Sequence, residues 1–298
     1  MQTTPSFSQR HPFLFGLALI VAAVALLAGA MAAIRFWFKD NGKTELIASD
    51  KLGVVRLDGL IDSSRPLVKW LGELREDKSV KGVLLRINSP GGVVAPSQEI
   101  YSAVRTLAAR KPVVVSMGTV AASGGYYAAA PATRIVANPG SITGSIGVIM
   151  EMANLEELFS KIGVKQTSIA SGKYKAAGSP FKTLTPEEKA YFEGLVHDLH
   201  AQFVADVAAG RNMTIPAVAA LADGRALTGR QARDAGLVDE LGGYEEAMST
   251  LRGLARVPED VNVVEGPRKE DTWLRDLLRS TLDLPPAGLS DGPRWLYR

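Results

Sequence analysis

The stretch "VKGVLLRINSPGGVVAPSQEIYSAVRTLAARKPVVVSMG" (residues 80–118) decides the fold class. Its two apolar runs, residues 80–88 and 112–118, have the length and composition of buried strands. Between them, residues 95–110 follow a helical pattern, with a proline near the first turn. A strand, a helix and a second strand in this order indicate an α/β fold with parallel strands.

The same alternation continues on both sides of this stretch. Further strands are predicted at residues 53–59 and 133–139. Helices are predicted, in chain order, at residues 66–75, 123–130, 186–209, 215–221, 229–235 and 244–255. Residues 169–182 are polar and rich in glycine and serine, without a regular pattern. We assign residues 51–257 to one catalytic domain.

The chain begins with an apolar segment, "FLFGLALIVAAVALLAGAMAAI" (residues 13–34), which contains no charged residue. At about 1.5 Å per residue it is long enough to cross a hydrocarbon core of about 30 Å. We therefore expect a transmembrane anchor at residues 13–38, between an N-terminal cytoplasmic segment (1–12) and a linker (39–50). A cleaved signal peptide is the alternative, although its apolar core usually has only about 7–15 residues.

Composition excludes several kinds of chemistry and partner. The chain has 298 residues and no cysteine, so it contains no disulfide, thiol nucleophile or cysteine-held metal. Its net charge of +3 is not gathered into a basic block, so nucleic acid is not expected as a partner. Residues 258–298 form a tail, in which 270–284 predict an amphipathic helix for assembly or membrane contact.

A lone serine, Ser123, lies in "GTVAASGGYYAAAP" (residues 118–131), between a predicted strand and a predicted helix. A strand, a turn of small residues and a helix expose a serine Oγ, and a helix N-terminus favours a developing oxyanion. The paired Gly91 and Gly92 of "INSPGG" (87–92) allow backbone amides to approach a substrate oxygen. An ordinary strand-to-helix turn would also explain these glycines.

A serine nucleophile needs a base, and histidine is poorly represented in this chain. Only His11, His197 and His200 occur, and the last two lie three residues apart on a predicted helix. With Glu193 they could form a metal cluster, but a solvated helix face is the simpler interpretation. A lysine base must be desolvated, because its unperturbed pKa is about 10.4. Lys173 and Lys175, in the polar stretch, are the candidates, and composition does not choose between them.

Three motifs together resemble the signal peptide peptidase A family of serine proteases, in its shorter, single-repeat form. They are "INSPGG", "MGTVAASGGYYAAAPATRIVANPGSITGSIGVI" (117–149) and "GRALTGRQARDAGLVDELGG" (224–243), within a match over residues 54–255. The resemblance implies a Clp protease/crotonase-like fold, a spiral of β-β-α units. It implies neither a cofactor nor a metal.

The resemblance also implies a role for six residues. Ser123 is the nucleophile, and Lys175, in "SGKYKAAGSP" (171–180), is the base. Ser145 hydrogen-bonds the lysine and helps to keep its ammonium form from being favoured. The oxyanion hole is formed by Gly91, Gly92 and Gly124.

Family membership further implies a homo-oligomeric ring at the cell (inner) membrane, in which neighbouring protomers share active sites. The catalytic domain then lies on the extracytoplasmic (periplasmic) side, and the substrates are cleaved signal peptides and other short apolar peptides. Two alternatives remain: an acyl-CoA enzyme of the crotonase kind, and a non-catalytic membrane scaffold. Binding of CoA tests the first, and labelling of Ser123 by a serine-reactive phosphonate tests the second.

Overall fold

A computed structural model describes residues 12–41, 50–267 and 296–297. The chain divides into two compact units, Met1–Ser49 and Asp50–Arg298. In the first unit, α2 (Pro12–Asn41) is one continuous helix. Across the described ranges, no helix combines the length and hydropathy that a membrane crossing requires, so the predicted anchor is not confirmed. The predicted tail helix at 270–284 lies outside the described residues.

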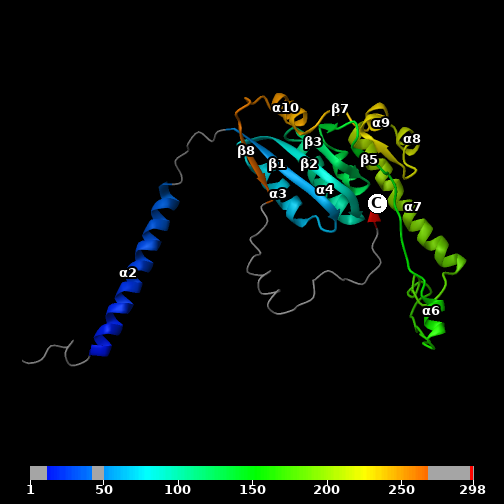
Figure 1. Ribbon diagram of the computed structural model, residues 1–298, viewed down its shortest axis with the longest axis horizontal. Helices are drawn as coiled ribbons and strands as arrows, with labels where there is room; N and C mark the ends of the chain where they lie inside the picture. Colours follow the sequence, from blue (N-terminus) through cyan, green and yellow to red (C-terminus); the bar gives the residue numbers. More distant parts are fainter. Residues whose placement is uncertain (1–11, 42–49, 268–295, 298) are drawn as a thin grey trace, which may run out of the picture. The chain divides into compact units, whose positions relative to one another are not determined.

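The second unit is built on one mixed sheet (Figure 1). Its described strands are β1 (Lys51–Ile61), β2 (Val80–Val93), β3 (Val113–Ala122), β4 (Arg134–Ala137), β5 (Ile142–Gly144), β6 (Ala226–Thr228), β7 (Glu240–Leu241), β8 (Asn262–Gly266) and β9 (Leu296–Tyr297). The strand order is β6-β5-β3-β2-β1-β8, with β4 beside β3, β7 beside β4 and β9 beside β2. The central strands are parallel, whereas β6 and β9 join antiparallel. The predicted α/β class is confirmed.

Helices cover both faces of this sheet. The helices of this unit are α3 (Arg65–Glu76), α4 (Val94–Ala108), α5 (Gly124–Ala129), α6 (Glu156–Lys161), α7 (Pro186–Arg211), α8 (Ile215–Ala219), α9 (Gly229–Asp234) and α10 (Tyr244–Ala255), of which α6 lies away from the sheet (Figure 1). Successive residues of β2 alternate between the two faces, as a pleated strand requires. Leu85 packs in the larger cluster with Ile100 of α4, and Leu84 packs in the smaller one with Leu251 of α10. Because both faces of β2 are buried, its sequence is a continuous apolar run.

β2 extends well beyond its predicted limit, and β8 is a strand that the sequence did not predict. β2 was expected to end at residue 88, but it continues through the two glycines to Val93. At Gly92 it runs so close to β1 that an added Cβ would lie 2.2 Å from the carbonyl oxygen of Ile61. β8 lies past residue 257, where we expected the tail to begin, and it pairs in parallel with β1 from Lys51↔Asn262 to Val55↔Gly266.

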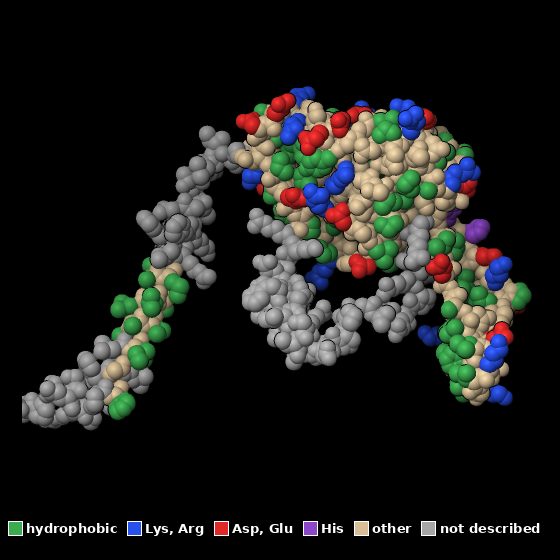
Figure 2. Space-filling model, viewed as in Figure 1, with side chains coloured by type: hydrophobic (Ala, Val, Ile, Leu, Met, Phe, Trp, Pro, Cys, Tyr) green, Lys and Arg blue, Asp and Glu red, His purple; other side chains and the backbone are tan. Residues whose placement is uncertain are grey.

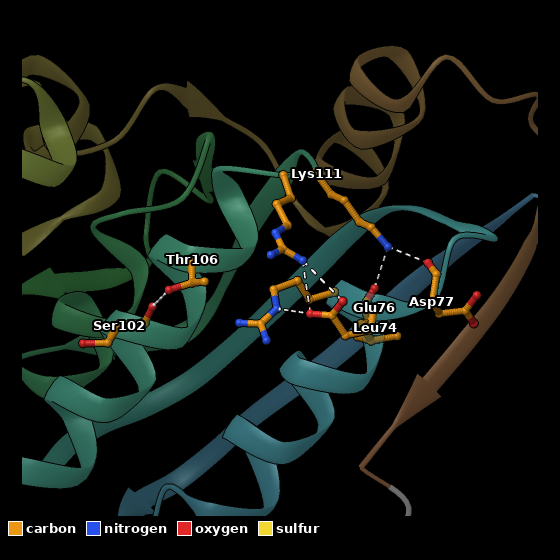
Figure 3. A network of polar contacts seen from close by, with 8 residues as sticks. Leu74, Glu76, Asp77, Ser102, Thr106 and Lys111 are labelled. Atoms are coloured by element: carbon orange, nitrogen blue, oxygen red, sulfur yellow. Dashed lines mark hydrogen bonds and ion pairs between the residues drawn. The ribbon is translucent and has the colours of Figure 1, made fainter.

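A polar network fixes the C-terminal end of α3 (Figure 3). The ammonium group of Lys111 donates to the carbonyl oxygens of Leu74, at 2.7 Å, and Asp77, at 2.5 Å. The Leu74 carbonyl belongs to the last turn of the helix, where carbonyls lack a helical donor, and the Asp77 carbonyl just past the helix also accepts from the amide of Val80, at 3.1 Å. The contact ties α3 to the loop between α4 and β3.

Candidate active site

Ser123 lies where β3 ends and α5 begins, and its backbone is strained. Its φ and ψ are 52° and −119°, a region that side chains with a Cβ rarely adopt. Two backbone bonds hold it there, because its amide donates to the Gly144 carbonyl and its carbonyl accepts from the Tyr127 amide, both at 2.8 Å. The residue is fully buried. Its Oγ has no hydrogen-bond partner among the residues that the structure describes.

Ser145 lies directly beside Ser123 because of the strand register. β3 and β5 pair in parallel through Ala122↔Gly144, the last residue of each strand, and each serine is the first residue after its strand. Ser145 also has a positive φ of 50°. Its amide donates to the carbonyl of Arg225, at 2.9 Å. The structure therefore brings together two residues that are far apart in the predicted motif.

The predicted oxyanion glycines lie against the same corner. A Cβ added to Gly124 would lie 3.3 Å from the backbone nitrogen of Gly92. Gly91 has a φ of 108°, and its amide donates to the hydroxyl of Ser89 at 3.1 Å. Backbone nitrogens beside a helix N-terminus form an environment that favours negative charge.

Lys175 is the one predicted residue that the chain does not bring to this corner. It lies in a turn between α6 and α7, where its amide donates to the Gly172 carbonyl at 3.1 Å. Its side chain is exposed, whereas Ser123 is buried and its Oγ is without a partner within the described chain. If Lys175 is the base for Ser123, its side chain must therefore reach the serine from another copy of the chain or after a rearrangement.

The structure separates the two lysine candidates. The ammonium group of Lys173 forms a 2.8 Å ion pair with Glu187. The hydrogen bond and charge of Glu187 raise the pKa of Lys173 above its ordinary value. A lysine held in its charged form is a poor proton acceptor. Composition alone could not make this distinction, because Glu187 lies outside the polar stretch.

Sequence reasoning also missed Ser97, on the first turns of α4. Its hydroxyl donates to the carbonyl of Val93 at 2.9 Å. It lies only 2.5 Å from the Cβ that any residue other than glycine would add at position 124. The only signal in the sequence was a serine five residues after the second of the paired glycines.

The histidines do not gather into a metal site in the described part of the chain. The Nε2 atom of His200 forms a hydrogen bond with the carbonyl of Ala222, at 2.8 Å. Within the described ranges, no cluster of three or more His, Cys, Asp or Glu side chains is placed to hold a metal ion.

The fold and this corner define a class of protein, a serine hydrolase with a mixed α/β sheet, a serine at the end of a strand and glycine amides beside it. The profile of peptidase family S49 matches residues 105–258, and that of Clp protease matches residues 58–143. The chain belongs to peptidase family S49, and it is a serine peptidase.

Three relatives show how far the similarity extends. A candidate protease of Synechocystis is 43% identical over 266 residues, which cover 83% of this chain and 96% of that protein. A candidate signal peptide peptidase SppA of Enterococcus faecium is 40% identical over 246 residues, covering 76% and 71%. The chloroplast serine protease SPPA of Arabidopsis thaliana is 34% identical over 245 residues, covering 77% and 36%.

Proposed function

We propose that this protein is a membrane-anchored Ser-Lys endopeptidase that degrades cleaved signal peptides and other short apolar peptides. The observation that carries the proposal is the buried, strained Ser123, whose Oγ has no hydrogen-bond partner in the described chain. Gly124 follows it directly, and the backbone nitrogen of Gly92 lies at the same corner. Such strain persists only where surrounding structure maintains it, and it gathers at functional sites. The substrate class is supported by the name of the Enterococcus relative.

The chemistry follows from these positions. Oγ of Ser123 attacks the peptide carbonyl, while uncharged Lys175 accepts the hydroxyl proton and then gives it to the leaving amine. The amides of Gly92 and Gly124 stabilise the oxyanion, joined by the amide of Gly91 once it gives up its bond to Ser89, and Ser145 orients the lysine. A water molecule then attacks the acyl-enzyme, which releases the acid and restores the serine hydroxyl.

We propose that Lys175 reaches Ser123 of a neighbouring protomer in a homo-oligomeric ring. The segment around α6 and the start of α7 has many hydrophobic side chains on its surface (Figure 2). Ile162 is 63% exposed and Ile169 is 98% exposed. Apolar surface of this kind favours a protein partner, and docking of the segment would also remove water from Lys175. The Clp protease/crotonase-like spiral of β-β-α units belongs to the same proposal.

The proposed location is the inner membrane, with residues 13–38 as the anchor and the catalytic domain on the extracytoplasmic side. The support is the uncharged segment of residues 13–34. The proposed substrates, cleaved signal peptides, also remain in the bilayer. This part of the proposal rests on the sequence. It predicts that the full chain resists extraction from membranes by alkaline carbonate, whereas a chain that begins at residue 50 is released.

The decisive test compares three variants of the full chain in detergent. Ser123→Ala and Lys175→Met should each lower the cleavage of a synthetic signal peptide by at least about a thousandfold. Lys173→Met is the matched control and should retain most activity, because Lys173 is paired with Glu187. Full cleavage by either of the first two variants would refute the mechanism. Mixing Ser123→Ala with Lys175→Met should restore activity if the site is shared between protomers.

A further inference from the structure

Asp206, on α7, is hydrogen-bonded to two neighbouring helices. Its carboxylate accepts from the hydroxyl of Tyr127 on α5, and its backbone carbonyl accepts from the hydroxyl of Tyr101 on α4, at 3.0 Å. Tyr127 is fully buried and Tyr101 is only 3% exposed, so either hydroxyl would be costly to leave unpaired. A bond to a carboxylate is also stronger than one between neutral groups. Asp206 therefore links α7 firmly to the helix that follows the proposed nucleophile.

This link lies at the end of α7 that packs on the core. Apart from Glu188, the buried residues of α7 are Phe203, Val204, Val207 and Ala208. At Gly210 the helix runs so close to the end of α5 that an added Cβ would lie 2.6 Å from the carbonyl oxygen of Ala130. None of residues 189–202, all of them within the described chain, is buried, and Figure 1 shows this part of α7 extending away from the sheet. The core therefore holds α7 by its last turns.

The other end of α7 carries the turn that contains Lys175. The two residues before this lysine are attached to the start of the helix. The ammonium group of Lys173 pairs with Glu187 at 2.8 Å. The ring of Tyr174 stacks on that of Tyr191, with centroids 4.9 Å apart. Lys175 must therefore follow any movement of the first turns of α7.

The length of α7 amplifies small changes in its direction. Between Glu187 and Asp206 the helix rises by about 28 Å, at about 1.5 Å per residue. A tilt of about 5° at Asp206 would therefore move the far end, with Lys175, by about 2.5 Å. Misplacement of a reacting group by about 1 Å can lower a catalytic rate about a hundredfold. The contact at Asp206 is thus distant from Lys175 in the chain but decisive for where the lysine lies.

We propose that Tyr127 and Asp206 are a positioning pair: their contact sets the direction of α7 and thereby places Lys175, which this helix supplies to the serine of a neighbouring protomer. This inference rests on the proposed function. The amide of Tyr127 also donates to the carbonyl of Ser123, at 2.8 Å, and that backbone bond does not need the Tyr127 hydroxyl. Loss of the side-chain contact should therefore lower kcat at least about tenfold and change KM less than about threefold.

The first experiment places one substitution on either side of a shared site. Ser123→Ala chains, which supply the lysine, are co-expressed with Lys175→Met chains, which supply the serine. Asp206→Ala on the lysine-supplying chain should lower kcat at least about tenfold relative to the parent pair. The same substitution on the serine-supplying chain should leave most of the activity, which also shows that the variant folds. Any result other than a loss confined to the lysine-supplying chain would overturn the inference.

Further variants of the lysine-supplying chain identify the bond. Asp206→Asn keeps an oxygen that accepts from Tyr127 and should retain more activity than Asp206→Ala, whereas Tyr127→Phe removes the donor and should lose activity as well. Asp198→Ala is the matched control on the same helix, because Asp198 accepts only an exposed 2.7 Å bond from Gln202 among the bonds described. It should leave kcat unchanged. A loss with Asp198→Ala as large as that with Asp206→Ala would refute a specific role for the pair.

The last experiment does not depend on catalysis. The chain has no cysteine, so cysteines introduced at the exposed Ala190 of α7 and Arg105 of α4 take spin labels specifically. Labelled Ser123→Ala chains are mixed with an excess of unlabelled chains, so that distances within one chain are measured. Asp206→Ala should shift or broaden the distance distribution by about 2.5 Å.

The two readouts separate the inference from the proposed function. An unchanged label distance would overturn the inference and leave the peptidase assignment in place. If the parent pair of co-expressed chains cleaves no peptide, the shared site of the proposed function fails, and the label distances still decide whether the pair sets the direction of α7.

Discussion

Replacing Gly124 with alanine tests the geometry of the proposed oxyanion site through two separable effects. The new Cβ would lie 2.5 Å from the hydroxyl of Ser97, which must then move and give up its bond to Val93. Loss of that bond with buried groups left unpaired costs about 1–3 kcal/mol. The gain from replacing a helical glycine is about 0.5–1 kcal/mol. We expect Gly124→Ala to lower the free energy of unfolding by about 1–2 kcal/mol.

The double variant Ser97→Ala/Gly124→Ala distinguishes this cause from general disruption. Ser97→Ala removes the clashing oxygen, so the two substitutions should be less destabilising together than their sum, by about 1 kcal/mol in a double-mutant cycle. Peptide cleavage should stay low in the double variant, because the added methyl group still lies 3.3 Å from the Gly92 nitrogen. Urea unfolding measures the first quantity, and kcat/KM measures the second. Recovery of both, or of neither, would refute the reasoning.

Three further predictions concern two polar contacts of the fold and one residue of the proposed site. Lys111→Met should destabilise the protein by about 1–3 kcal/mol in urea unfolding, because the Leu74 carbonyl loses the ammonium donor while the Asp77 carbonyl keeps only the Val80 amide; Lys69→Met, which removes an exposed 3.9 Å pair, should change stability by less than about 0.5 kcal/mol. Bonds from Arg225 lower the pKa of Asp223 from 3.8 to about 2. A depressed folded value means that this stabilisation is complete above pH 3.8 and is lost as the pH falls towards 2. Asp223→Asn should therefore flatten the acid dependence of stability in that window, and an unchanged slope counts against the pair. Ser145→Ala should move the ascending limb of the pH–rate profile to higher pH, and an unmoved limb would rule out a role for Ser145 beside the lysine.

The sequence predicted the central strands and the position of Ser123 because those signals are local. An apolar run such as that of β2 indicates a strand that is buried on both faces of the sheet. The small residues around Ser123 likewise report a tight turn before α5. The S49 assignment rests on the comparisons, which the motifs anticipated.

Features that depend on long-range packing could not be predicted. The continuation of β2 past residue 88 runs against the turn signals of proline and glycine, and it exists because Gly92 fits against Ile61 of β1. β8 is short, and only its pairing with β1 makes it a strand. The adjacency of Ser123 and Ser145 follows from the β3–β5 register, which no local pattern encodes. The role of Lys175 stays a prediction, because its side chain is exposed in the single chain.

The backbone of Ser123 has a consequence for how the molecule can change over time. Its φ of 52° and ψ of −119° suit glycine, and holding a serine there costs about 1–3 kcal/mol. Ser123→Gly should therefore yield a chain that is inert and yet harder to unfold than its parent. Selection for stability alone would therefore favour glycine at position 123. The serine found there indicates that some stability is given up for the proposed activity.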